Sequence, residues 1–192
     1  MDLNKIELYA KENNIPIMEK EGIEFLTKFI KENNIKEILE IGAAIGYSAI
    51  KMCLIDDNIK VTTIERDKKR YDEAVKNINL FNLNNRINII FGDALDIDVE
   101  GKFDLIFIDA AKSQSIKFFT KYEKNLKDYG FIITDNINFH GLTFSDNPAP
   151  TRNLRQMIRK IHNYLDWLNK NETYITEYKN VGDGITISRK NR

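Results

Sequence analysis

The sequence is poor in the residues that build disulfides, metal clusters and rigid loops. Cys53 is its single cysteine, and two histidines and three prolines occur among 192 residues. One cysteine excludes an internal disulfide and a cysteine-cluster metal site, and it is most simply a small buried residue on a helix. No apolar run approaches the roughly 20 residues of a membrane span, and the N-terminal stretch MDLNKIELYA lacks the apolar core of a signal peptide. We therefore expect a cytoplasmic protein.

The chain as a whole also lacks an excess of charge of one sign. Its 29 basic residues are balanced by 29 acidic residues, so the global charge indicates neither a nucleic-acid binder nor a membrane-surface protein. A local basic patch is still compatible with this balance. Hydrophobic residues make up 42% and charged residues 30%, which is typical of a globular chain. The length fits one domain over residues 1–192 with a sizeable core.

The apolar periodicity changes repeatedly between that of a strand and that of a helix. Strands are predicted over residues 37–42, 60–65, 87–93, 103–109, 130–136, 173–179 and 184–190. Helices are predicted over residues 3–13, 19–33, 47–55, 67–82, about 114–127 and 151–170. This alternation indicates an α/β fold, a mostly parallel sheet with helices on both faces. The turn NVGDG joins the last two strands as a hairpin that adds an antiparallel strand at one edge.

Acidic residues stand where four of the predicted strands end. They are Glu65, Asp93, Asp109 and Asp135. Ligands of such sheets bind outside the carboxyl ends of the strands, so we expect these acids to converge on one binding site.

The stretch EIGAAIGYS, residues 40–48, is a glycine-containing turn from a strand to a helix. A dinucleotide fingerprint needs glycines at 42, 44 and 47, whereas this sequence has Gly42, Ala44 and Tyr47, which argues against NAD. Glu40 beside the turn would repel a phosphate but tolerate an ammonium and a sulfonium. The turn therefore favours S-adenosylmethionine over nucleotides that carry phosphate.

Two acids suit the adenosine part of that cofactor. Glu65 lies 23 residues after Gly42, and a carboxylate at this position can accept hydrogen bonds from both hydroxyls of a ribose. Asp93 in the stretch GDA could face the adenine. The alternative is that both are solvated acids at strand ends.

Oxygen ligands are also expected at the ends of two neighbouring strands. Asp109 ends one strand, and Asp135 with Asn136 ends the next. Two carboxylates alone would repel each other, and a divalent cation such as Mg²⁺ removes that conflict. Lys112 is then close enough to reach an oxygen bound to the metal. The alternative is that Asp135 and Asn136 only cap a turn, which is common for this pair.

Several motifs together carry a family resemblance. The stretches EIGAAIGYSA, TTIERD, GDA, DLIFIDAAK and ITDN occur in this order, and the match extends over about residues 15–190. In this combination the chain resembles the cation-dependent O-methyltransferases, the group of catechol and caffeoyl-CoA methyltransferases. IPIMEKEG (15–22) and PAPTRNLRQMIRKI (148–161) resemble the bacterial branch that methylates 5-hydroxyuridine at the tRNA wobble position.

The resemblance implies a class I methyltransferase fold, which is Rossmann-like with a seven-stranded sheet, and a homodimer. It implies that S-adenosylmethionine is held by Met18, Ser48, Glu65, Asp93 with Ala94, and Asp109, in addition to the turn residues Glu40 and Gly42. It implies Mg²⁺ on Asp109, Asp135 and Asn136.

The expected reaction is methyl transfer to a hydroxyl whose neighbouring carbon also carries an oxygen. Lys112 is expected to act as the base or to stabilise the oxyanion, and Asp109 is the second expected catalytic residue. In 5-hydroxyuridine the 5-hydroxyl and the 4-carbonyl form such a pair. Two alternatives remain: an O-methyltransferase for small catechol-like molecules, and a non-catalytic adenosine-binding module. The module would not need the set of Asp109, Lys112, Asp135 and Asn136.

The stretch TRNLRQMIRK bears on the choice between the two enzymes. It holds Arg152, Arg155, Arg159 and Lys160 without an acid, directly after a long irregular stretch over 137–150. The three arginines are three and four residues apart, so they share one helix face. Arginine suits phosphate and stacked bases, and we expect this face to bind the tRNA anticodon loop. The alternative is an ordinary solvated helix face.

Overall fold

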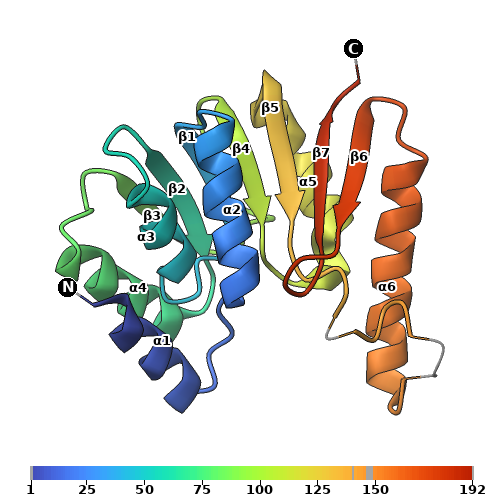
Figure 1. Ribbon diagram of the computed structural model, residues 1–192, viewed down its shortest axis with the longest axis horizontal. Coiled ribbons are helices and arrows are strands. Elements are labelled where there is room, and N and C mark those ends of the chain that lie inside the picture. Colours follow the sequence, from blue (N-terminus) through green and yellow to red (C-terminus); the bar gives the residue numbers. More distant parts are fainter. Residues whose placement is uncertain (1, 140, 146–148, 192) are drawn as a thin grey trace.

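The fold is built on one seven-stranded sheet. The computed structural model describes residues 2–139, 141–145 and 149–191, so part of the loop expected over 137–150 lies outside the described residues. The strands are β1 (Glu37–Ile41), β2 (Lys60–Glu65), β3 (Ile87–Phe91), β4 (Phe103–Ile108), β5 (Leu126–Thr134), β6 (Tyr174–Lys179) and β7 (Ile185–Lys190). They are arranged in the order β3-β2-β1-β4-β5-β7-β6 (Figure 1). β1 to β5 run parallel, whereas β7 is antiparallel to both of its neighbours. The antiparallel strand thus lies one place in from the edge.

Helices cover both faces of this sheet. They are α1 (Leu3–Glu12), α2 (Lys20–Glu32), α3 (Tyr47–Cys53), α4 (Lys68–Leu80), α5 (Ser115–Tyr122) and α6 (Arg152–Asn169). Buried residues of α1 to α4 share one hydrophobic core with the sheet, and those of α5 and α6 share the other. Figure 1 shows α2 in front of the sheet and α5 behind it. The predicted two-sided α/β architecture is confirmed.

Residues 105–108 of the central strand β4 are apolar without a break because both faces of the strand are covered there. Leu105 and Phe107 belong to the core under α1 to α4, while Ile106 and Ile108 belong to the core under α5 and α6. Successive side chains of a strand point to opposite faces, so a strand covered on both sides needs an apolar residue at every position. The run ends at Asp109, which is where the strand leaves the two cores.

The predicted boundary between the helix near 114–127 and the following strand is wrong. A short 3₁₀ turn (Glu123–Asn125) ends the helix, and β5 already begins at Leu126. Tyr122 donates to the carbonyl of Ala94, and Asn125 donates to the carbonyl of Gly101, so the helix end is fixed by contacts distant in sequence. Position 130 inside this strand is occupied by glycine, because a Cβ there would come 2.9 Å from the carbonyl oxygen of Asp104.

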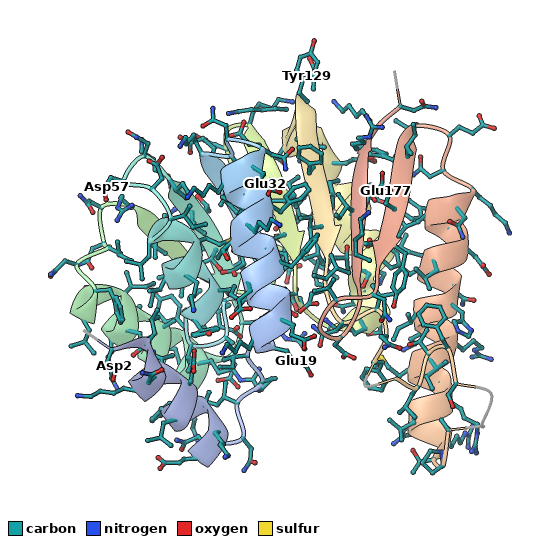
Figure 2. The ribbon with its side chains drawn as sticks, viewed as in Figure 1. Asp2, Glu19, Glu32, Asp57, Tyr129 and Glu177 are labelled. Atoms are coloured by element: carbon teal, nitrogen blue, oxygen red, sulfur yellow. The ribbon has the colours of Figure 1, made fainter. Side chains whose placement is uncertain are left out.

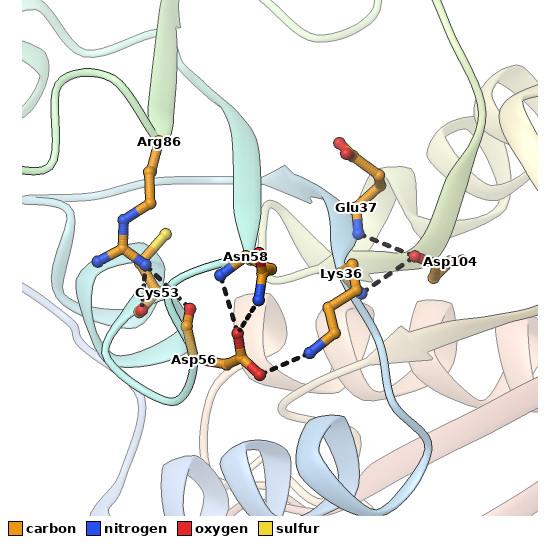
Figure 3. Close-up of polar contacts among 7 residues, drawn as sticks. All are labelled: Lys36, Glu37, Cys53, Asp56, Asn58, Arg86 and Asp104. Carbon is orange, nitrogen blue, oxygen red and sulfur yellow. Dashed lines mark hydrogen bonds and ion pairs between the residues drawn. The ribbon is translucent and has the colours of Figure 1, made fainter.

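Polar contacts at the amino ends of the strands serve the fold. Asp104 on β4 accepts hydrogen bonds from the backbone N–H groups of Lys36 and Glu37 at 3.0 and 2.8 Å, which fixes the start of β1 (Figure 3). Arg86 donates to the carbonyl oxygens of Cys53 and Asp56 and so joins the end of α3 to β3. Buried Cys53 fills the small apolar position expected of it. Within the described residues, no helix is both long and apolar enough to cross a membrane.

Candidate active site

A cavity of 340 Å³ opens at the carboxyl ends of the parallel strands. The predicted site residues that line it are Gly42, Glu65, Asp93, Ala94, Asp109, Lys112 and Asn136. Separate strands deliver them to one place, because parallel strands end at the same edge of the sheet.

The glycine turn brings the backbone of β1 against the end of β4. Gly42 has a φ of +103°, and a Cβ at this position would lie 2.2 Å from the carbonyl oxygen of Asp109. The N–H groups of Gly42 and Ala43 both donate to the carbonyl of Ile64 on β2. Any side chain at Gly42 would therefore push apart the strand ends that form the cavity floor.

Glu65 is held rigidly at the cavity wall. Its two carboxylate oxygens accept hydrogen bonds from the N–H groups of Ala44 and Asp67, each at 2.8 Å. Asp93 accepts from the N–H of Leu95 at 2.9 Å and lies 3.4 Å from the guanidinium of Arg66. Because the backbone fixes the Glu65 carboxylate, its remaining lone pairs are aimed in a fixed direction.

Four predicted cofactor or metal residues are not among the described residues that line the cavity. They are Met18, Glu40, Ser48 and Asp135, and all four are buried. Glu40 is 0% exposed and accepts hydrogen bonds from the hydroxyls of Ser48 and Thr63. Burial raises its pKa from 4.5 to about 7, although the two hydroxyls lower it. Glu40 and Ser48 thus form an internal pair behind the glycine turn.

The acids expected to bind a metal come together as one cluster. The Asn136 amide nitrogen donates to the carboxylate of Asp109 at 2.9 Å and to that of Asp135 at 3.0 Å. Lys112 Nζ lies 3.2 Å from Asp109 Oδ1 and donates to the backbone carbonyl of Asp135 at 3.1 Å. Asn136 has a φ of 61°, a left-handed conformation that asparagine tolerates well. The cluster is therefore more than a turn cap.

The electrostatics of this cluster suit a cation. Burial and the neighbouring carboxylate of Asp109 raise the pKa of Asp135, while the charge of Lys112 lowers it. Within the described part of the chain, no three His, Cys, Asp or Glu side chains gather as a metal site. The available donors are two carboxylates and the amide oxygen of Asn136. Hard oxygen ligands of this number, with room left for water or substrate, fit Mg²⁺.

A second, shallower hollow lies on α6. It has a volume of 410 Å³ and is lined by Arg152, Arg155, Gln156 and Arg159. We call Arg152, Arg155 and Arg159 the arginine row. All three are exposed, and Arg155 donates to the carbonyl of Ala149 at 2.8 Å. Figure 1 shows the first turns of α6 at the same end of the sheet as the carboxyl ends of the parallel strands.

Sequence reasoning missed part of the cavity wall. Pro16 and Ile17, between α1 and α2, line it, and so do Arg66 and Arg70. Arg66 directly follows Glu65 and could have been inferred from its place after a strand-end acid. Pro16 and Ile17 precede Met18, which the resemblance gave as the cofactor residue of this segment, and the packing of the segment brings them to the cavity in its place.

The chain resembles known proteins over its whole length. Residues 2–191 match the family model described as O-methyltransferase. Caffeoyl-CoA O-methyltransferase 1 of Nicotiana tabacum is 30% identical over 182 residues, which cover 87% of this chain and 74% of that protein. A crystal structure from Staphylococcus aureus, named as a candidate caffeoyl-CoA O-methyltransferase, is 39% identical, with a TM-score of 0.93 over 100% of this chain and 93% of that one. An O-methyltransferase from Bacillus cereus in complex with SAH is 25% identical, with a TM-score of 0.82 over 98% and 90% of the two chains.

Proposed function

This chain belongs to the O-methyltransferase family and is an S-adenosylmethionine-dependent O-methyltransferase, and we propose that its acceptor is 5-hydroxyuridine at the tRNA wobble position. The product would be 5-methoxyuridine, formed with Mg²⁺ in the cytoplasm by a homodimer. The observation that carries the choice of substrate is the arginine row, which lies at the same end of the sheet as the candidate active site.

The cavity residues have distinct proposed roles toward the cofactor, which supplies a methyl group on a sulfonium. Glu65, held by two backbone N–H groups, accepts from the ribose hydroxyls. Asp93 and Ala94, which line the cavity, would face the adenine, and Asp109 would face the methionine part. Ser48 acts from behind the glycine turn, where its hydroxyl already donates to Glu40.

Asp109, Asp135 and Asn136 would hold the metal. The Asn136 amide nitrogen lies within hydrogen-bonding distance of both carboxylates, so rotation of this one side chain to exchange its nitrogen and oxygen would direct three oxygen ligands at one ion. When bound, Mg²⁺ would supply a charge that lowers the pKa of the acceptor hydroxyl and orients its neighbouring oxygen.

Lys112 is placed to handle the proton of that hydroxyl. Its Nζ is held between Asp109 and the backbone carbonyl of Asp135, and its side chain is 14% exposed. A neutral Lys112 accepts the proton, and a charged Lys112 stabilises the oxyanion. The residues of the cluster would hold the acceptor oxygen toward the methyl group that the cofactor supplies. Most of the rate enhancement in such a transfer comes from positioning.

The arginine row fits an RNA acceptor for two reasons. The planar guanidinium binds phosphate through two parallel hydrogen bonds, and the three side chains point from one helix face without an acid among them. A base in a single-stranded loop can be turned out of its stack into a pocket. The wobble base would then reach the cluster at the strand ends while the loop backbone stays on α6.

Replacing the arginine row with glutamine tests the proposal. The Michaelis constant for tRNA should rise, and the slope of its logarithm against the logarithm of salt concentration should fall by about 0.7 for each phosphate that the variant no longer binds. Affinity for S-adenosylmethionine should stay unchanged. A matched triple variant removes three exposed cations toward the opposite end of the sheet: Lys28→Gln, Lys31→Gln and Arg189→Gln. Equal effects of both triple variants would refute a specific role of the arginine row.

The second candidate substrate is a small catechol-like molecule. It is favoured by the relatives that are named caffeoyl-CoA O-methyltransferases. Such a reaction uses the same cluster and needs no arginine row. Full activity of the arginine variant on a free catechol, together with no activity of the wild type on tRNA that carries 5-hydroxyuridine, would establish this alternative.

A further inference from the structure

Two exposed aromatic side chains lie together beside the candidate active site. Phe144 is 55% exposed and Tyr178 on β6 is 39% exposed. Their ring centroids are 5.3 Å apart and their planes meet at 63°, so the two rings support each other edge to face. More than half of the Phe144 surface stays open. An exposed aromatic ring held in place by a second ring is a suitable platform for a stacking ligand.

The strand register fixes how far the backbone of Tyr178 lies from the acid cluster. Tyr178 on β6 is opposite Thr186 on β7, and Thr186 is opposite Thr134 on β5. Asp135 follows Thr134 directly. Neighbouring strands are spaced so that two steps across the sheet span roughly 10 Å. This backbone separation leaves room for a second base beside one that presents its oxygens to Asp135.

The loop that carries Phe144 connects the pair to the arginine row. Thr143 is buried, and its N–H donates to the carbonyl of Asn138 at 3.0 Å. His162 on α6 donates through Nε2 to the carbonyl of Thr143 at 2.8 Å. His162 lies three residues after Arg159 and so continues the arginine row along the same helix face. Phe144 therefore lies where the row of cations ends.

We propose that Phe144, supported by Tyr178, stacks on a base of the anticodon loop adjacent to the wobble base. The arginine row holds the backbone phosphates that lead to it. This inference rests on the proposed tRNA function and specifies how that site selects RNA. A free catechol or a single nucleoside has no neighbouring base, so it gains nothing from the platform.

The first test compares Phe144→Ala with the wild type on an anticodon stem-loop that carries 5-hydroxyuridine. The Michaelis constant should rise roughly 5- to 150-fold, the range that removal of one base–aromatic stack produces. Turnover at saturation and the salt slope should stay as in the wild type, because every phosphate keeps its cationic partner. Phe144→Trp should restore binding, whereas Phe144→Leu, which keeps an apolar side chain without a ring, should not.

The second test removes the ligand of the platform. Stem-loops with an abasic sugar on the 5′ or the 3′ side of the wobble position are assayed in turn. One of them should weaken binding to the wild type as much as Phe144→Ala does, and it should not weaken binding to Phe144→Ala any further. The control variant is Tyr129→Ala, which removes a ring 74% exposed at the opposite end of the sheet (Figure 2).

The outcomes separate this inference from the proposed function. If the wild type methylates the stem-loop and Phe144→Ala does so equally well, the platform is refuted and the tRNA function stands. If Phe144→Ala loses activity equally on stem-loop and free nucleoside, the ring supports the acceptor pocket itself and the platform is again refuted. If the wild type does not methylate the stem-loop at all, both proposals are refuted.

Discussion

The buried carboxylate of Glu40 provides a test of the structure that needs neither substrate nor metal. Glu40 is fully buried on β1, and the hydroxyls of Ser48 and Thr63 are its hydrogen-bond donors. Glu40→Gln keeps the shape of the side chain and both hydrogen bonds, since a glutamine amide can accept from one hydroxyl and donate to the other. It removes only the charge that the folded protein must bury.

The size of the effect follows from the pKa of Glu40, which burial raises from 4.5 to about 7. Between these values the folded protein binds a proton at Glu40 that the unfolded chain has released. The free energy of unfolding therefore falls as pH rises through this window. The shift corresponds to about 3 kcal/mol at pH 8. Glu40→Gln should thus be nearly neutral at pH 4.5 and stabilising by up to about 3 kcal/mol at pH 8.

Urea unfolding of the wild type and of Glu40→Gln at several pH values measures this difference in unfolding free energy directly. The contributions of the other titrating groups cancel because both proteins contain them. Thr63→Val is the matched variant. It removes a hydrogen bond that favours the charged form of Glu40, so its destabilisation should grow as pH rises. The opposite outcome is a difference in unfolding free energy between Glu40→Gln and the wild type that stays constant from pH 4.5 to pH 8. That result would falsify the claim that burial raises the pKa of Glu40. Unchanged cofactor affinity in Glu40→Gln would separate this residue from direct cofactor binding.

Three further substitutions test the cavity and the proposed metal cluster beside it. Asp135→Ala should abolish transfer and leave the protein folded, as measured by circular dichroism. A chelator should inactivate the wild type until Mg²⁺ is restored. Full activity of the wild type in excess chelator would contradict the metal site. Glu65→Ala should weaken S-adenosylmethionine binding at least about tenfold in calorimetry, because it removes charge-assisted hydrogen bonds worth about 1.5–3 kcal/mol each, without any gain of NAD binding. An unchanged dissociation constant would move the ribose elsewhere. Lys112→Met should lower turnover far more than cofactor affinity and flatten the pH–rate profile, whereas a purely structural lysine would leave turnover within a few fold of the wild type.

The positions of the strand-end acids can be predicted because they follow from local pattern and one topological rule. A continuous apolar run such as Leu105 to Ile108 marks a strand covered on both faces, and parallel strands end at one edge. The sequence alone therefore leads to the expectation that Asp109 and Asp135 meet. The same rule brings Glu65 and Asp93 to the cavity.

The burial of Glu40 depends on register, which the sequence pattern does not specify. Glu40 pairs with Thr63 across β1 and β2, and this register places a hydroxyl beside the carboxylate. From sequence alone, an acid next to the glycine turn is equally compatible with an open cavity wall. The early start of β5 is missed for a similar reason, since Tyr122 and Asn125, which end the preceding helix, bind carbonyl groups more than twenty positions away.

The two halves of the site differ in how the fold specifies them. The proposed cofactor half is formed mainly by residues at strand ends, which the sheet order brings to one edge. The proposed acceptor half is formed by the loop after Asn136, the arginine row and β6, which are brought together by register across β5, β7 and β6. The exposed side chains of these elements, the arginine row with Phe144 and Tyr178, belong to neither hydrophobic core, so they can change without loss of the fold. This architecture therefore permits one methyl donor to be combined with different acceptors. The identity of the acceptor has to be tested at Phe144 and the arginine row.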